Sequence, residues 1–200
     1  MTLMYNNIYN KLILLFSFIF IFGCSNKDNY NIEIIDLASY SSLSIDANNI
    51  LIENKVENSI EYPFIDHLIS NNMKFYIDEW IKTRIAPNYE SENLIKIIIK
   101  KANIKAFSLN NNNNIQDIFI NKAAKRVEID VYLIIEIIDA KNKKLAYLDL
   151  KAFKSKELAE NISLKKKDYI IQNMINETLM DFDKLAIAKM KEIFSAYIRI

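Results

Sequence analysis

The chain has one histidine, His67, which directly follows Asp66 in the stretch Pro-Phe-Ile-Asp-His-Leu. A histidine whose ring is oriented by a carboxylate can act as a general base. Side chains that are adjacent in a chain point in different directions, however, and no nucleophile stands in a recognisable motif nearby. We therefore expect a surface or structural histidine at position 67. General-base catalysis, with Asp66 as the orienting group, is the alternative.

Acidic residues offer a second route to catalysis, because two carboxyl groups can hydrolyse a glycosidic bond. Glu128, Asp130 and Glu136 alternate with apolar residues, so we expect them on the outer face of one strand. An open sheet face provides no cleft for a sugar. A hydrolase that uses carboxylates is therefore kept only as the alternative function.

Other common chemistries lack the residues that they need. With one cysteine and one histidine in the chain, a zinc site would depend on carboxylates. Phosphate-binding loops and nucleophile elbows need glycine, and the only glycine is Gly23, near the N-terminus. We therefore predict no catalytic residue, no bound metal and no cofactor, and we expect that the protein is not an enzyme.

An apolar stretch precedes the only cysteine, Cys24. Residues 12–22 read LILLFSFIFIF and follow Lys11. This stretch is shorter than the roughly 20 residues that a membrane-spanning helix needs. A basic residue, a short apolar segment and a small residue in this order are typical of a signal peptide. The segment is therefore predicted to direct export.

Residues 21–24, Ile-Phe-Gly-Cys, resemble the lipobox of bacterial lipoproteins. In that family the cysteine thiol receives a diacylglyceryl group, and the signal peptidase cleaves just before it. The resemblance implies cleavage between Gly23 and Cys24, a lipid anchor on Cys24, and a location in the bacterial envelope facing the periplasm. Ser25 slightly favours the outer membrane. The alternative is an ordinary signal or an uncleaved anchor that happens to contain a cysteine.

The remainder of the chain has the composition of a globular domain. The whole sequence is 51% hydrophobic and 26% charged, which suits one domain with a real core. Removing residues 1–23 takes away one lysine and no acid, so the remaining formal charge is zero. Since no positive excess is left to attract nucleic acid, none is expected as a partner. The expected organisation is a signal peptide over 1–23, a lipidated cysteine and flexible tether over 24–43, and one domain over 44–200.

Hydrophobic periodicity predicts an α+β fold with the element order β-α-β-β-β-α. A helix is expected from a cap at Ser70 or Asn71 to Pro87, and a second over 164–198. The second starts with a lysine cluster at 165–167 that we expect to be solvated. Strands are expected at 45–56, 94–109, 126–138 and 145–155, with a possible bulge near Lys100. The last two strands form a hairpin, so the sheet should be mainly antiparallel, with both helices packed on one face.

Several positions resemble a group of uncharacterised alphaproteobacterial lipoproteins: Pro63 and His67-Leu68, the helix with Trp80, the strand from Arg126, and Asp181-Phe182-Asp183. The element order is also loosely similar to that of the auxiliary lipoproteins of ABC-type and intermembrane lipid-transport systems. Those families are non-catalytic. The resemblance implies a periplasmic module that binds an envelope protein or an apolar ligand, and it assigns no binding residue.

Overall fold

The computed structural model describes residues 35–57, 59–109, 124–159 and 161–199. By its internal contacts the chain divides into two units, Met1–Tyr30 and Asn31–Ile200. The expected signal peptide and the expected lipidation site, Cys24, lie outside the described residues. Everything below therefore concerns the second unit.

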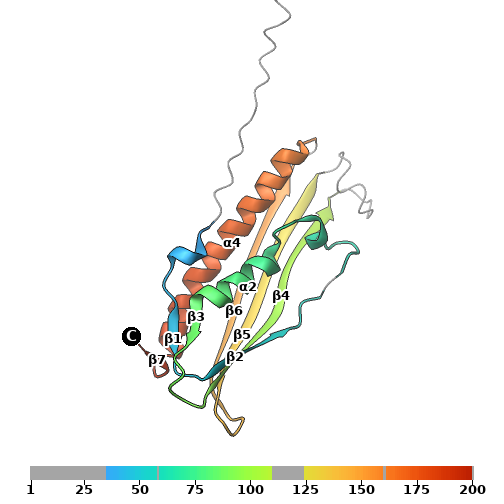
Figure 1. Cartoon of the computed structure of the whole chain (residues 1–200). Coiled ribbons are helices and arrows are strands. Elements are labelled where there is room, and N and C mark those ends of the chain that lie inside the picture. The colour runs from blue at the N-terminus through green and yellow to red at the C-terminus, as the bar shows by residue number, and fades with distance from the viewer. Residues whose placement is uncertain (1–34, 58, 110–123, 160, 200) are drawn as a thin grey trace, which may run out of the picture. The chain divides into compact units, whose positions relative to one another are not determined.

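The described elements follow one another along the chain in Figure 1. They are the 3-10 helix η1 (Leu37–Ser39), strands β1 (Leu43–Ile45) and β2 (Asn49–Asn54), the 3-10 helix η2 (Asp66–Leu68), helix α2 (Met73–Arg84), strands β3 (Ile85–Pro87), β4 (Leu94–Ser108), β5 (Lys125–Ile138) and β6 (Lys144–Leu158), helix α4 (Leu164–Ile193) and strand β7 (Ile198–Arg199).

The strands form two sheets, in the orders β2-β4-β5-β6 and β3-β1-β7. In the larger sheet β4, β5 and β6 are antiparallel neighbours, whereas β2 runs parallel to β4. In the smaller sheet β1 is parallel to β3 and antiparallel to β7. The α+β class is as predicted, but the sheets are mixed. Parallel neighbours need a crossover connection, and here α2 lies in the chain between β1 and its partner β3 and between β2 and its partner β4.

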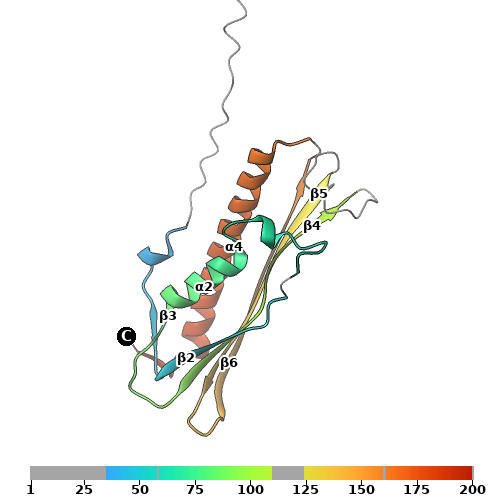
Figure 2. The ribbon, with the colours of Figure 1, turned by 45° about the vertical axis from the view of Figure 1, so that its right-hand side comes forward.

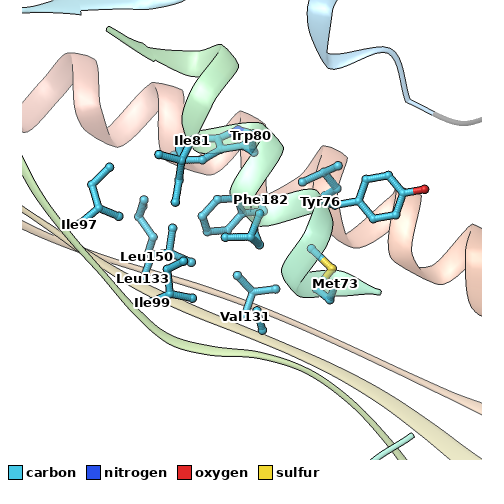
Figure 3. Close-up of a cluster of buried hydrophobic side chains, with 14 of the residues drawn as sticks. Met73, Tyr76, Trp80, Ile81, Ile97, Ile99, Val131, Leu133, Leu150 and Phe182 are labelled. Carbon is cyan, nitrogen blue, oxygen red and sulfur yellow. The ribbon is translucent and has the colours of Figure 1, made fainter. Parts of the chain in front are cut away.

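Both helices cover the same face of the four-stranded sheet, as predicted (Figures 1 and 2). Figure 3 shows side chains from α2 and α4 meeting those of β4, β5 and β6. At the centre of this layer the rings of Trp80 and Phe182 pack edge to face, with centroids 5.0 Å apart. We call this covered face the inner face and the opposite one the outer face.

Strand β5 explains why the sheet is two-sided. Beyond Lys125, which begins the strand, its inward residues are apolar and fully buried, and they are Val127, Ile129, Val131, Leu133, Ile135 and Ile137. β-branched side chains suit a pleated surface, and burying each large one contributes roughly 1.5–3 kcal/mol. The register of β4 against β5 shifts between Ile99 and Lys101, which confirms the predicted bulge. The bulge keeps the inward side chains of β4 in phase with the core on both sides of it.

The chain makes its left-handed turns without glycine in the described residues. The φ angles of Tyr89, Asn142 and Asn161 are 63°, 62° and 63°. Asparagine adopts this conformation more readily than most residues. In the β5–β6 turn the Asp139 carboxylate also accepts hydrogen bonds from the backbone N–H groups of Lys141 and Lys143, at 2.9 and 2.8 Å. The turn predicted between these strands is therefore held by local polar contacts.

The predicted strand over 45–56 is wrong in one respect, because it is two strands in two sheets. β1 ends at Ile45, and the backbone N–H of Asp46 donates to the Tyr197 carbonyl at 2.7 Å. β2 then begins at Asn49 and pairs with β4. The apolar alternation changes phase across the break, from Ile45 and Ala47 to Ile50 and Ile52, and the prediction of one strand overlooked this change.

The helix boundaries also differ from the prediction. Asn72, rather than Ser70 or Asn71, caps α2 by accepting the Phe75 N–H at 3.1 Å, and α2 ends at Arg84 because the next three residues pair with β1 as β3. Helix α4 runs unbroken from Leu164 to Ile193, about 45 Å at 1.5 Å per residue. It ends before 198 because Ile198–Arg199 pairs with β1.

Part of the predicted tether belongs to the domain. Leu37 in η1 is buried in the core, and the carbonyl of Ser41 accepts a hydrogen bond from Arg84 of α2. The domain therefore begins before residue 44. In the described ranges, no helix is long and apolar enough to cross a membrane.

Candidate functional site

Asp66 and His67 lie in η2, beside the edge of β4 that β2 leaves unpaired. The chain runs along this edge, with the Ile65 N–H donating to the Ile104 carbonyl at 3.0 Å and the Ala106 N–H to the Pro63 carbonyl at 2.9 Å. Both carboxylate oxygens of Asp66 accept the Ile104 N–H, at 3.0 and 3.2 Å. Asp66 therefore satisfies a backbone donor that β2 does not reach.

This geometry counts against the general-base alternative. The Asp66 carboxylate is directed at the Ile104 N–H and does not hold the ring of His67, which is exposed. The exposed ring is what the surface interpretation of His67 predicts. Burial raises the pKa of Asp66 to about 6, despite the opposing effect of the Ile104 hydrogen bond. Asp66 is thus a structural carboxylate with an unusual titration range.

A cavity of about 180 Å³ adjoins η2 and the start of α2. Its polar lining includes Glu57, Asp66, His67, Lys74 and Asn103. Several of these groups already have partners: the Lys74 amine lies 2.5 Å from Asp78, and the Asn103 amide donates to the Glu57 carbonyl at 3.1 Å. The cavity is smaller than the roughly 300 Å³ at which drug-sized ligand pockets begin.

A second cavity, of about 190 Å³, lies between the chain after η2 and the first half of α4. It is lined by Leu68, Ile69, Ser70, Asp168, Ile171 and Gln172. One carboxylate and two small polar groups do not make a nucleophile–base pair. Neither cavity therefore presents an arrangement with recognisable catalytic chemistry.

The three acids considered for hydrolysis lie on the outer face of β5, as predicted. Each has a basic neighbour: Glu128 pairs with Arg126 at 2.8 Å, Asp130 with Lys101 at 2.7 Å, and Glu136 with Lys144 at 2.5 Å. None of the three lines either cavity. Among the described residues no group of three or more histidine, cysteine or acidic side chains is placed to hold a metal.

A buried polar cluster ties α2 to α4. Asp183 accepts hydrogen bonds from the indole N–H of Trp80 and from Nε of Arg84, both at 2.7 Å. Arg84 also donates to the carbonyl of Ser41, and its guanidinium lies over the ring of Tyr40 at 5.1 Å. Arg84 was not singled out from the sequence, although its i+4 spacing from Trp80 places both side chains on the same helix face. The cluster joins three chain segments and is structural.

The lysine cluster at the start of α4 is not uniformly solvated. Lys165 and Lys166 are exposed, but Lys167 is buried. Burial, reinforced by the nearby charge of Lys125, lowers the pKa of Lys167 to about 8. The prediction of a solvated helix start is therefore wrong for this residue, which lies on the packed side of α4.

The outer face carries aromatic residues that sequence reasoning did not single out. On β6 the exposed fractions of Tyr147 and Phe153 are 44% and 61%. The Lys151 amine lies 4.6 Å from the ring centroid of Tyr132 on β5, within cation–π range. Alternation along β6 places Tyr147 and Phe153 on the side of Asp149 and Lys151, so the sequence contained the signal.

No family model matches the chain, and no curated protein matches it. Several solved structures align with it, among them the following three. A minor lipoprotein from Acinetobacter baumannii is 12% identical, with a TM-score of 0.35, over 76% of this chain and 93% of that chain. A protein described as a neuraminyllactose-binding hemagglutinin homologue from Helicobacter pylori is 8% identical, with a TM-score of 0.40, over 81% and 92%.

The third structure is a Xanthomonas campestris protein of the family DUF330. It is 8% identical, with a TM-score of 0.32, over 81% of this chain and 95% of that chain. All three TM-scores lie below 0.5, so the alignments assign this chain neither a family nor an activity.

Proposed function

We propose that the protein is a bacterial lipoprotein, anchored through Cys24, whose domain faces the periplasm and acts by binding. The observation that carries this proposal is the Ile-Phe-Gly-Cys sequence at 21–24, directly after a short apolar segment and one lysine. A cysteine at the end of such a segment is the residue whose thiol is acylated in bacterial lipoproteins. This role also accounts for a chain that keeps a single cysteine.

The energetics of lipidation support a lasting anchor. Each buried methylene contributes about 0.8 kcal/mol, and one acyl chain alone holds a protein only marginally. Two or three chains on Cys24 would make the attachment effectively permanent. The described domain starts by residue 35, so fewer than a dozen residues separate it from the anchor, at most roughly 40 Å of extended chain. The domain would therefore work close to the membrane surface.

Binding is favoured over catalysis by the side chains of the described domain. The acids on β5 are in ion pairs on an open face, and the Asp66 carboxylate accepts a hydrogen bond from the backbone N–H of Ile104. These contacts remove the support for a carboxylate hydrolase, so it is not retained. Within the binding proposal, the partner is an envelope protein or apolar ligand, and we place the module beside lipid or ABC-type transport machinery, at the outer membrane.

Phase partition tests the anchor. The wild-type chain and a Cys24→Ala variant are expressed in a bacterium that processes lipoproteins, and each is partitioned between detergent and water. We expect the wild type in the detergent phase and the variant as an unprocessed precursor about 23 residues longer, because acylation precedes cleavage. A Ser25→Ala variant is the matched control and should behave as wild type. Equal processing of all three chains would contradict the proposal.

Chemical cross-linking in the native envelope tests the partner. If the module serves transport, the wild-type chain should form adducts with components of a transport system. The adducts should disappear when the domain is released by a signal peptide that lacks the cysteine. Adducts confined to soluble periplasmic enzymes would contradict the placement beside transport machinery.

A further inference from the structure

Strand β6 is the outermost strand of the four-stranded sheet. It runs for 15 residues and pairs with β5 along one edge. Within the described residues, no backbone hydrogen bond from β6 reaches any strand other than β5. An edge of this length is a template for a further strand unless something blocks it.

The middle of β6 has a nearly symmetric arrangement of side chains. Residues 147–153 read Tyr-Leu-Asp-Leu-Lys-Ala-Phe, with an aromatic residue at each end and an acid and a base on either side of Leu150. Asp149 and Lys151 are well exposed, with 45% and 64% of their side chains accessible. Within one chain their charged groups lie 3.7 Å apart, an exposed ion pair that contributes little and leaves both groups open to a partner. The two aromatic residues are also exposed, at 44% and 61%. All four lie on the outer face, while Leu148 and Leu150 point into the core.

We propose that a second copy of this chain pairs with it, β6 against β6 and antiparallel, about a twofold axis at Leu150. Residues that are directly opposite in an antiparallel pair lie on the same face of the sheet. The twofold axis must therefore pass through a residue position. With the axis at Leu150, Asp149 lies opposite the partner's Lys151, and Tyr147 lies opposite the partner's Phe153. Symmetry repeats both contacts, and the two four-stranded sheets become one.

Neighbouring registers are worse. With the axis at 149, Asp149 lies opposite the partner's Asp149, and with the axis at 151, Lys151 lies opposite the partner's Lys151. Like charges directly opposite one another destabilise a strand pair. An axis at 153 brings Phe153 together with its symmetry mate but places Asp149 opposite the partner's Glu157. Among these registers, the one centred on Leu150 matches both the charges and the aromatic residues.

The ends of β6 limit the paired length. The register against β5 shifts between Ile137 and Ile138, so β6 is irregular near Leu145. Towards the other end, the Lys154 amine is held by Glu177 of α4 at 2.8 Å, on the inner side. The proposed pairing therefore spans about 146–154. Lysines on an edge usually discourage pairing, but in this register the exposed Lys151 meets an acid.

The contact is small for a protein interface. Stable interfaces bury roughly 1,200–2,000 Å² in total, and two edge strands with their flanking side chains bury less. The dimer is therefore reversible and is best captured by cross-linking. This inference does not depend on the lipid anchor, because β6 presents the same edge on an unanchored chain.

Site-directed cross-linking of the full chain tests the register. Copies carrying Tyr147→Cys and copies carrying Phe153→Cys are expressed together and treated in their own membranes with a short bismaleimide. Opposed Cβ atoms are about 5 Å apart, whereas position 147 and its own symmetry mate are separated by six residues, about 20 Å. We expect mixed dimers when both variants are present and at least fivefold fewer when either is present alone.

The chain without an added cysteine is the control and should give no cross-link. If Cys24 is free rather than acylated, this control will react through it, which separates failure of the anchor from failure of the dimer. Equal cross-linking of each variant alone, or adducts only with a different protein, would overturn the proposed pairing.

A charge swap at positions 149 and 151 gives a second readout on the same cysteine pair. Asp149→Lys or Lys151→Asp alone should cut the mixed cross-link severalfold, because each places like charges opposite one another. The double variant should restore it, and so should mixing the two single variants, since their charges are complementary. If the single variants lose the cross-link and neither the double variant nor the mixture of the two single variants restores it, the proposed register is wrong.

Discussion

The two faces of the four-stranded sheet are built from the same strands but do different work. On the inner face of β5 the side chains from Val127 to Ile137 are apolar and fully buried beneath the helices. On the outer face the neighbours of those residues include four charged side chains in ion pairs, such as Asp130 with Lys101. Because side chains alternate along a strand, every second residue packs in the core and stabilises the fold, and the residues between them face outward and can contact a partner. Changes on the two faces should therefore have very different consequences.

The largest contrast is expected between two phenylalanines. Phe182 is fully buried against Trp80, whereas Phe153 is 61% exposed on the outer face. Phe182→Ala should lower the free energy of unfolding by about 3–5 kcal/mol, because it removes buried area and leaves a cavity. Phe153→Ala should change it by less than about 0.5 kcal/mol. Urea unfolding of both variants measures the difference, and equal losses would abolish the distinction between the faces.

The next contrast concerns two aspartates. Asp183 is buried and accepts from Trp80 and Arg84, whereas Asp130 pairs with Lys101 on the outer face. Asp183→Ala should cost roughly 3 kcal/mol, because it leaves the guanidinium buried without its carboxylate. Asp130→Ala should cost no more than about 1 kcal/mol, since an exposed pair is screened by water. The same urea titration reports both values, and similar costs would show that the Asp183 cluster is not a structural tie.

A smaller effect is expected from Asp66. Its folded-state pKa is raised from 3.8 to about 6, so the folded state holds the proton more tightly than the unfolded chain does. The associated stability is fully present below about pH 4 and is lost as the pH rises through 6. Two pKa units correspond to about 3 kcal/mol, which partial exposure reduces to about 1–2 kcal/mol.

Asp66→Asn tests this effect, because the amide oxygen can still accept the Ile104 N–H without a charge. The variant should be more stable than wild type at pH 7 and about equal to it, or slightly less stable, at pH 4. Thermal unfolding at both pH values gives the comparison, and Asp130→Asn serves as the exposed control. A stability difference between wild type and Asp66→Asn that is the same at both pH values would contradict the raised pKa.

The sequence predicts the central hairpin well because its information is local. The alternation in β5 and β6, the polar turn predicted over 139–144 and the bulge after Ile99 depend on neighbouring residues. The division of 45–56 into two strands was missed, because the partners of β1 lie far along the chain, at Ile85–Pro87 and Ile198–Arg199. The only local sign is the change of phase at residues 48–49, which does not show where each piece pairs. The burial of Leu37 and the hydrogen bond from Arg84 to the Ser41 carbonyl were missed for the same reason. The residues next to Leu37 and Ser41 in the sequence do not indicate these distant contacts.

The candidate sites divide in the same way. The exposure of His67 and the outward position of Glu128 and Asp130 followed from local pattern. The use of Asp66 as an acceptor for Ile104 did not, because the two residues are 38 positions apart and the bond exists only once the edge of β4 is formed. The exposed positions of Tyr147 and Phe153 on β6 could have been predicted by counting alternate residues along the strand. The amino-acid composition gives no sign of them.

The intact mass of the protein purified from its native membrane tests the central claim most directly. The account predicts a chain that lacks residues 1–23 and carries the added mass of two or three acyl chains on Cys24. An unmodified Cys24 thiol, on either a precursor or a shortened chain, would contradict the anchor. The domain would then be a secreted or otherwise tethered module, and its place in the envelope would have to be sought from its partners alone.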